Sequence, residues 1–387
     1  MDKITLIYDY VNRRSKSDVE FKSSITSVYK RNSRWSNGLL RFMVFMMSIF
    51  LRPRSKAVKY FFWGSKFEDI ILGMDRREIC VLGGPKQLRF CIKNGVKFIP
   101  VMNFWKGLSR GLESDFSLLK LEDIHSLTKL FYVYAGESPV LVVDTDSLPM
   151  QRVVLTAFSS MSTGRSICIQ HGVFQSKTQS DLLDGWMADN FFVMDENQHK
   201  IMISKGMERS KLAVMGFYSS PYIPIRTTSR PSQRKVCFFG QPWARYGEAR
   251  AAKYLDILKR VESLTASEGL EFFYKLHPWE SGLDYVAGIQ GRVNCGMEQA
   301  LENFDVFVSI TSTALLEAGA AGRIAIQVMD EDFSCDDFST FSSVKAIDVE
   351  SDSFNQDLKS CINGVSGEVG NQVKPAELFL SALEGAK

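Results

Sequence analysis

Two of the four histidines in this chain end segments that are typical of buried strands. His277 follows the apolar run 270–276, and Pro278 comes directly after it. Because proline has no N–H to donate to a sheet ladder, the predicted strand stops at His277. His171 ends a second predicted strand, 166–172, in the same way before a glycine. The carboxyl edge of an open α/β sheet is where ligands bind, so both imidazoles are candidate active-site groups.

A lone histidine is more often a core or surface residue than a catalytic one. Two histidines at matching strand ends, one in each half of the chain, favour a shared site across two domains. With an unperturbed pKa of about 6.5, an imidazole suits proton transfer at neutral pH. His125, near Asp123, and His199, in the polar stretch 197–200, are predicted to be surface residues.

A second candidate is the run of hydroxyl residues Thr311, Ser312 and Thr313, between a predicted strand and a predicted helix. Helix capping by Ser312 or Thr313 would explain one hydroxyl. Three in a row, with free N–H groups and the positive end of the helix dipole, favour a phosphate site. Glu317, four residues after Thr313, could then reach the ribose hydroxyls of a nucleotide.

Gly240 ends another predicted strand and is followed by Gln241. A glycine at that position lets a ligand approach the backbone, although an ordinary turn explains it equally well. The sequence contains no G-x-G-x-x-G and no Walker A pattern, which argues against a dinucleotide-binding dehydrogenase. Lys275 and Arg245 are candidates to add positive charge at a phosphate.

The motif Asp144-Thr145-Asp146 also follows an apolar strand. A D-x-D holds the nucleotide diphosphate through a divalent cation in single-domain, metal-dependent glycosyltransferases. A strand-end turn with an Asx cap explains the motif as well, and the motif is far in sequence from the other candidates. We therefore expect no metal site and no cofactor.

Alternating strands and helices must position these residues. Strands are predicted at 4–10, 78–84, 97–102, 139–144, 166–172, 190–195, 211–216, 236–240, 270–276, 304–310, 324–328 and 344–349. Helices are predicted at 18–30, 37–62, 114–134, 150–161, 196–206, 246–268, 297–302, 312–321 and 374–386. This alternation predicts an α/β protein with two Rossmann-like, doubly wound domains.

At 387 residues the chain is too long for one ordinary core. A polar stretch with three prolines marks an interdomain linker. The predicted divisions are an N-terminal domain at 1–218, a linker at 219–233, a C-terminal domain at 234–373 and a closing helix at 374–387. The seven cysteines are scattered, with no C-x-x-C, so we expect core thiols in a reducing compartment rather than disulfides or zinc.

The segment 11–64 is strongly basic, with twelve Lys or Arg against two acidic residues, in a chain of net charge +3. Within it, 42–51 has only one polar residue. A transmembrane helix needs about 20 residues, so this run cannot span a bilayer. It is either a helix lying on an anionic cytoplasmic leaflet or a buried core helix with solvated basic flanks. No nucleic-acid-binding module accompanies the charge, so no nucleic-acid partner is expected.

The order and spacing of three motifs resemble those of bacterial GT-B glycosyltransferases that build surface polysaccharides, namely the sialyltransferase, Kdo-transferase and teichoic-acid glycerophosphotransferase group. The motifs are Gln170-His171-Gly172, Leu276-His277-Pro278, and Ser312-Thr313 followed by Glu317. The resemblance covers about 166–328. It implies two domains facing across a cleft, with the N-terminal half on the acceptor side and the C-terminal half binding the nucleotide donor.

In that group the histidine of the His-Pro motif and the Ser/Thr pair contact the donor phosphate. The resemblance implies these roles for His277, Ser312 and Thr313. The sialyltransferases have an acidic-acidic-Gly motif where this chain has residues 170–172, which argues against sialic acid. The glycerophosphotransferase-like members have His-Gly there, with the histidine as base, which implies that role for His171.

The sequence thus predicts a metal-independent glycosyltransferase that moves a sugar from a nucleotide-activated donor, with CMP as one candidate nucleotide, to a glycan or lipid-linked acceptor. We expect it in capsule or lipopolysaccharide synthesis, peripheral on the inner face of the cytoplasmic membrane. The predicted site comprises catalytic His171 and His277, donor-binding Gly240, Gln241, Lys275, Pro278, Ser312, Thr313 and Glu317, and acceptor-side Gln170 and Gly172. Alternatives are a CDP-alditol glycerophospho- or ribitolphosphotransferase, a nucleotide-sugar epimerase and an inactive assembly subunit.

Overall fold

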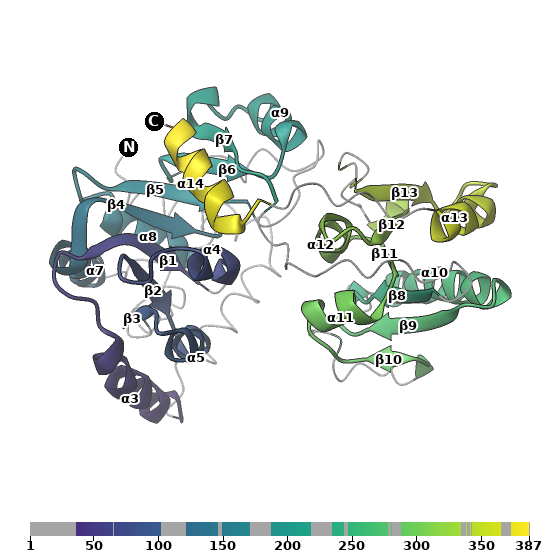
Figure 1. The fold of residues 1–387 in the computed structure, drawn as a ribbon, viewed down its shortest axis with the longest axis horizontal. Coiled ribbons are helices and arrows are strands. Elements are labelled where there is room, and N and C mark those ends of the chain that lie inside the picture. Colours follow the sequence, from purple (N-terminus) through teal and green to yellow (C-terminus); the bar gives the residue numbers. More distant parts are fainter. Residues whose placement is uncertain are drawn as a thin grey trace. The chain divides into compact units, whose positions relative to one another are not determined.

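The computed structural model divides the chain into two compact units (Figure 1). It describes residues 36–64, 66–101, 121–145, 149–170, 187–217, 234–243, 247–277, 280, 288–333, 338, 341, 343–364 and 373–386. Unit 1 contains the described residues up to 217 together with 374–386. Unit 2 contains the described residues from 234 to 373.

Unit 1 is built on a parallel sheet with the strand order β3-β2-β1-β4-β5-β6-β7. The strands are β1 (Val58–Trp63), β2 (Ile79–Gly83), β3 (Lys97–Pro100), β4 (Ala135–Val143), β5 (Arg165–Ile169), β6 (Asn190–Val193) and β7 (Leu212–Val214). The central strands are runs of buried apolar residues without polar alternation. Such runs are typical of parallel sheets covered on both faces.

The described part of unit 1 also contains helices and short 3-10 turns. They are α3 (Ser36–Ser48), η1 (Ile49–Leu51), α4 (Glu68–Leu72), α5 (Pro85–Asn94), α7 (Leu121–Tyr134), α8 (Pro149–Phe158), α9 (Glu196–Ser204), η3 (Arg209–Lys211) and α14 (Pro375–Gly385). The helix α14 follows unit 2 along the chain but belongs to the core of unit 1. Its Phe379 ring is fully buried and lies 6.1 Å from the ring of Tyr60 and 6.0 Å from that of Phe62, centroid to centroid.

Unit 2 is built on a second parallel sheet, ordered β10-β9-β8-β11-β12-β13. Its strands are β8 (Lys235–Phe239), β9 (Glu271–Lys275), β10 (Arg292–Val293), β11 (Val306–Ser309), β12 (Ile324–Met329) and β13 (Val344–Asp348). The other elements are α10 (Glu248–Ser267), α11 (Met297–Asn303), α12 (Ala314–Ala320), η7 (Glu331–Phe333) and α13 (Phe354–Asn363). Apolar residues of α10 and α13 pack with those of the strands in one core.

Both sheets start at a central strand, build outward to one edge, and then return to build toward the other edge. The reversal occurs between β1 and β4 in unit 1 and between β8 and β11 in unit 2. In doubly wound sheets, ligands bind beyond the carboxyl ends of the strands at this switch point. The predicted fold class, α/β with two Rossmann-like, doubly wound domains, is therefore confirmed. That the two domains face each other across a cleft stays a prediction.

The predicted helix 37–62 is wrong beyond residue 51. After η1 the chain passes Pro53, which cannot continue a helix, and enters β1, an inner strand of the unit 1 sheet. The β1 residues 60–63 are aromatic and buried between β2 and β4, a composition typical of strands. The end of the basic segment 11–64 is thus core.

Other differences lie in short elements. The sequence did not predict α4, α5, α13 or the two-residue strand β10. The predicted strand 4–10 and helix 18–30 fall outside the described residues, as do the linker 219–233 and the start of the predicted helix 114–134.

Candidate functional site

The switch point of unit 2 brings together two of the predicted motifs. The strands β8 and β11 are neighbours, with Phe238 opposite Val308. Beyond them, the side chains of Gln241 and Thr311 meet, because the Thr311 hydroxyl donates to the Gln241 side-chain oxygen at 3.0 Å. Two residues before Thr311, the Ser309 hydroxyl donates to the main-chain oxygen of Phe239 at 3.0 Å. These bonds hold the two loops at a fixed separation.

The hydroxyl run ends at a shorter helix than predicted, because α12 begins at Ala314 rather than at Ser312. Thr313 is the N-cap residue, but its side chain makes no capping hydrogen bond. The Ser312 oxygen accepts from the Ala314 N–H at 3.4 Å, which is at the long limit for such a bond. The expected side-chain capping is therefore weak, and both hydroxyls are half-buried at the switch point.

His277 is held just beyond β9 by a reciprocal pair of hydrogen bonds with Glu280. The His277 main-chain N–H donates to Glu280 Oε2 at 2.7 Å. The Glu280 N–H in turn donates to the His277 main-chain oxygen at 2.9 Å. These two bonds fix the backbone of the predicted His-Pro turn, while Pro278 itself lies outside the described residues.

Glu280 links this turn to the aromatic core of unit 2. Its side chain is fully buried and accepts a hydrogen bond from the Tyr274 hydroxyl at 2.5 Å. The Tyr274 hydroxyl lies 2.9 Å from that of Tyr254, which accepts from the Gln241 N–H at 3.0 Å. A continuous chain of hydrogen bonds, here called the switch-point network, therefore connects six residues. They are His277, Glu280, Tyr274, Tyr254, Gln241 and Thr311.

The network keeps the Tyr274 hydroxyl protonated. Burial raises the pKa of Tyr274 far above its usual range, and the neighbouring Tyr254 and Glu280 groups raise it further. The Tyr274 hydroxyl therefore remains a hydrogen-bond donor to the Glu280 carboxylate. A buried carboxylate with donors on both oxygens is stably held, whereas an unpaired one would be costly.

Gly240 has a packing role that the sequence did not reveal. A Cβ at this position would lie 2.2 Å from Glu280 Oε2 and 2.7 Å from the Tyr274 hydroxyl oxygen. Glycine is thus required by the close approach of the network to the end of β8. Ligand approach to the backbone is not needed to explain it.

The structure describes two of the remaining donor-side candidates, Lys275 and Glu317. Lys275 places its ammonium group 5.9 Å from the centre of the Phe239 ring. Because successive side chains of a strand point to opposite faces, Lys275 lies on the face of the sheet opposite Tyr274. Glu317 is half-buried on α12, and Arg245 lies outside the described residues.

Gln170, predicted on the acceptor side, is used within unit 1. It is buried, and its side-chain oxygen accepts from the Met194 N–H at 3.0 Å. Its side-chain nitrogen donates to the Gln198 side-chain oxygen. These bonds tie the end of β5 to the start of α9, so an acceptor contact for Gln170 stays a prediction. His171 and Gly172 lie outside the described residues.

Asp144 lies at the switch point of unit 1, directly after β4. Its carboxylate accepts from the Gln151 side-chain nitrogen at 3.1 Å and lies 3.6 Å from the Lys66 ammonium group. These partners account for Asp144 as a paired strand-end residue. Asp146 of the D-x-D motif lies outside the described residues.

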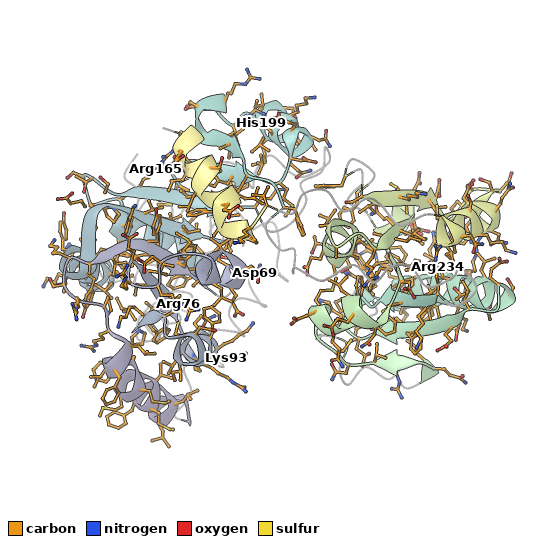
Figure 2. All side chains as sticks on the ribbon, viewed as in Figure 1. Asp69, Arg76, Lys93, Arg165, His199 and Arg234 are labelled. Carbon is orange, nitrogen blue, oxygen red and sulfur yellow. The ribbon has the colours of Figure 1, made fainter. Side chains whose placement is uncertain are left out.

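The two histidines predicted at the surface differ in how far their side chains are exposed. His125 is exposed on α7, as predicted. His199, labelled in Figure 2, has a side chain only 13% exposed and lies 4.0 Å from the Glu196 carboxylate. The polar sequence around His199 concealed its position, because α9 turns this side chain toward the body of unit 1 rather than toward water.

Sequence reasoning missed the buried members of the network. Glu280 stands three residues after His277, a spacing at which a side chain can reach back to a main-chain N–H. Tyr274 and Tyr254 sit in patterns that predict only core packing, and nothing in one sequence shows that their hydroxyls meet.

No protein-family model matches the sequence, and no curated protein matches it. Solved structures show similarity in fold. One is the Anabaena protein Alr3699/HepE in complex with UDP and glucose, at 11% identity over 84% of this chain and 99% of that chain, with a TM-score of 0.51. Another is the Methanocaldococcus jannaschii UDP-GlcNAc 2-epimerase in complex with UDP-GlcNAc and UDP, at 11% identity, 84% and 99% coverage and a TM-score of 0.50.

A third similar structure is that of S. aureus MnaA with UDP, at 12% identity over 83% of this chain and 92% of that chain, with a TM-score of 0.51. At these identities the similarity shows the shared two-domain α/β fold. It does not show which reaction this chain performs.

Proposed function

We propose that the chain is a nucleotide-sugar enzyme that binds its nucleotide donor at the switch point of unit 2. The observation that supports this most directly is the switch-point network, which joins the turn at His277 to the loop after β8 and the loop after β11. A site at this position has main-chain N–H groups, hydroxyls and an imidazole at the same edge of the sheet. Those groups suit a nucleotide phosphate.

The reaction we propose is metal-independent transfer of the sugar to an acceptor. The bond between the anomeric carbon and the donor phosphate oxygen breaks, and a bond from that carbon to the acceptor oxygen forms. His277 as imidazolium, with the hydroxyls of Ser312 and Thr313, stabilises the charge that develops on the departing phosphate. His171 takes the proton from the acceptor hydroxyl.

The acceptor in this proposal is a glycan or a lipid-linked glycan of capsule or lipopolysaccharide synthesis. Lipid-linked acceptors reside at the membrane, so the enzyme would work peripherally on the inner face of the cytoplasmic membrane. In this proposal the first half of the chain selects the acceptor.

Epimerisation of a nucleotide sugar is a second candidate function. It is favoured by the similar fold of the M. jannaschii UDP-GlcNAc 2-epimerase. The two functions place the nucleotide at the same switch point and differ in whether the sugar leaves it. An epimerase would turn over its nucleotide sugar with no acceptor present.

The test is a donor panel with the purified full-length chain. CMP-, UDP- and GDP-sugars and CDP-alditols are incubated with and without membrane glycolipid extract, and released nucleotide and product mass are measured. Acceptor-dependent nucleotide release supports transfer, and the product mass separates sugar transfer from alditol-phosphate transfer. Sustained epimer formation without acceptor would establish the second candidate instead.

A matched pair of variants tests the site. We expect His277→Ala to lower turnover by about 10²–10³-fold, in line with loss of a charge-stabilising donor. His125→Ala, at an exposed position of α7, should leave turnover unchanged. If His171→Ala and His277→Ala both support full glycan production in cells, the site assignment is wrong.

A further inference from the structure

The helix α3 with the turn η1 exposes an unusual amount of apolar surface. Nine of the sixteen large apolar side chains that are exposed in the described part of the chain lie between residues 39 and 50. They are Leu39, Leu40, Phe42, Met43, Phe45, Met46, Met47, Ile49 and Phe50. Phe42 is 60% exposed and Phe50 is 88% exposed. We call these nine side chains the α3 apolar surface.

Among the described side chains of this element, a narrow stripe contacts the body of unit 1. Val44 and Ser48 are buried, and Leu51 packs against the core. The helix contacts β3 and α5 (Figure 1). At 3.6 residues per turn, the exposed apolar positions cover roughly two-thirds of the helix circumference. A helix that is apolar around most of its surface is expected in a protein core or in lipid.

The charged residues of this segment have a single sign. From residue 36 to residue 67 the sequence has six Lys or Arg and no Asp or Glu. The Arg52 guanidinium lies over the Phe45 ring, 5.1 Å from its centre, and Arg54 is exposed just after η1. On the neighbouring helix α5, Lys86, Arg89 and Lys93 are exposed, and α5 has no acidic residue.

We propose that the α3 apolar surface docks on an anionic lipid bilayer, with the α3 apolar side chains in the headgroup and acyl boundary and the cations of η1 and α5 on the lipid phosphates. Apolar burial and attraction to anionic headgroups together drive such interfacial binding. With 13 residues, α3 is about 20 Å long and lies on the bilayer rather than across it. Among the described residues, no helix is long and apolar enough to cross a membrane.

The same charges disfavour the other occupants of this surface. A symmetric dimer through α3 would bring each basic surface against its own copy, so like charges would face each other. The chain's own residues 11–34 have seven Lys or Arg against Asp18 and Glu20, so they match this surface poorly in charge. An anionic bilayer satisfies both the apolar area and the cations.

Vesicle flotation of the purified full-length chain tests this without any substrate, and so independently of the proposed reaction. We expect binding to vesicles of phosphatidylglycerol and phosphatidylcholine, and much weaker binding to phosphatidylcholine alone. The double variant Phe42→Ser with Phe50→Ser should lower the partition coefficient at least about tenfold, because binding scales with buried apolar area. Circular dichroism and thermal unfolding should match the wild type, since both side chains are exposed.

Two further variants sharpen the test. The control Val214→Ser with Val373→Ser removes two exposed apolar side chains elsewhere and should bind vesicles like the wild type. Arg54→Glu with Arg89→Glu should weaken binding to the anionic vesicles, and salt raised to about 0.5 M should do the same. The proposal is overturned if the wild type binds neither vesicle, if F42S/F50S binds like the wild type, or if the α3 surface instead drives dimer formation in solution.

Discussion

Units 1 and 2 share one strand topology but hold the carboxyl ends of their strands in different ways. In unit 2 the switch point is fixed by a buried carboxylate and two buried tyrosine hydroxyls, with Glu280, Tyr274 and Tyr254 all inaccessible to solvent. In unit 1 the corresponding position has Asp144 beside Lys66, whose side chain is 47% exposed. A satisfied buried network is rigid and costly to disrupt, whereas an ion pair with a half-exposed lysine is partly screened by water.

This difference teaches that topology places a site and side-chain burial decides how firmly it is held. The loops after β8 and β11 are joined by direct hydrogen bonds, so the predicted donor site of unit 2 is preorganised. Unit 1 gains its rigidity elsewhere, from an aromatic core that includes a helix from the far end of the chain.

Removing that helix contact should have the largest effect. Phe379→Ala deletes a fully buried ring of α14 and leaves a cavity among the rings of unit 1, so the free energy of unfolding should fall by about 3–5 kcal/mol. Hydrogen exchange resolved by peptide should show the loss in unit 1 and not in unit 2. Leu380→Ala, on the exposed side of the same helix, is the control. Equal losses in both units would contradict the separate cores.

Glu280→Ala should have the next largest effect, and in unit 2. It leaves the Tyr274 hydroxyl and the His277 N–H without their acceptor, at a cost of about 2–4 kcal/mol in unfolding free energy. Glu271→Ala, an exposed carboxylate 3.9 Å from the Lys235 ammonium group, should cost less than about 1 kcal/mol. Chemical unfolding compares the two. Similar costs would show that the buried network does not stabilise unit 2.

Gly240→Ala tests the close packing within the network. Its Cβ would overlap Glu280 Oε2, so we expect a loss of about 1–3 kcal/mol. In the Glu280→Ala background the nearest obstructing oxygen is gone and the Tyr274 hydroxyl, 2.7 Å from where the Cβ would lie, remains, so the same substitution should cost less but not nothing. A double-mutant cycle by urea unfolding measures this coupling. Additive costs would mean that Glu280 is not the group that excludes a side chain at Gly240, which leaves Tyr274.

Lys66→Gln in unit 1 should have the smallest effect. The Lys66–Asp144 pair is separated by 3.6 Å and is partly exposed, so its loss should cost less than about 1 kcal/mol. That cost should shrink further at high salt. Thermal unfolding at two salt concentrations measures both. A loss as large as that of Glu280→Ala would remove the contrast between the two switch points.

Much of the fold could be predicted because buried parallel strands are long apolar runs separated by helices. The strand ends at 239, 275 and 309 were close to prediction, and they place Gln241, His277 and Ser312 at one sheet edge. The strand β1 was missed because the predicted helix 37–62 was extended past Pro53, although a proline cannot continue a helix. The apolar residues on both sides of Pro53 made the two elements look like one helix.

The sequence by itself determined the fold class, the candidate histidine and hydroxyl residues, and the concentration of positive charge around α3. These follow from composition and local spacing, which a single chain displays directly. Only the tertiary structure decided that Glu280 and two tyrosines bind one another, that Gly240 is required by their packing, that α14 belongs to unit 1, and that α3 presents its apolar side chains outward. Each of these depends on contacts between residues distant in sequence, or on which face of an element is covered, and local pattern does not specify either.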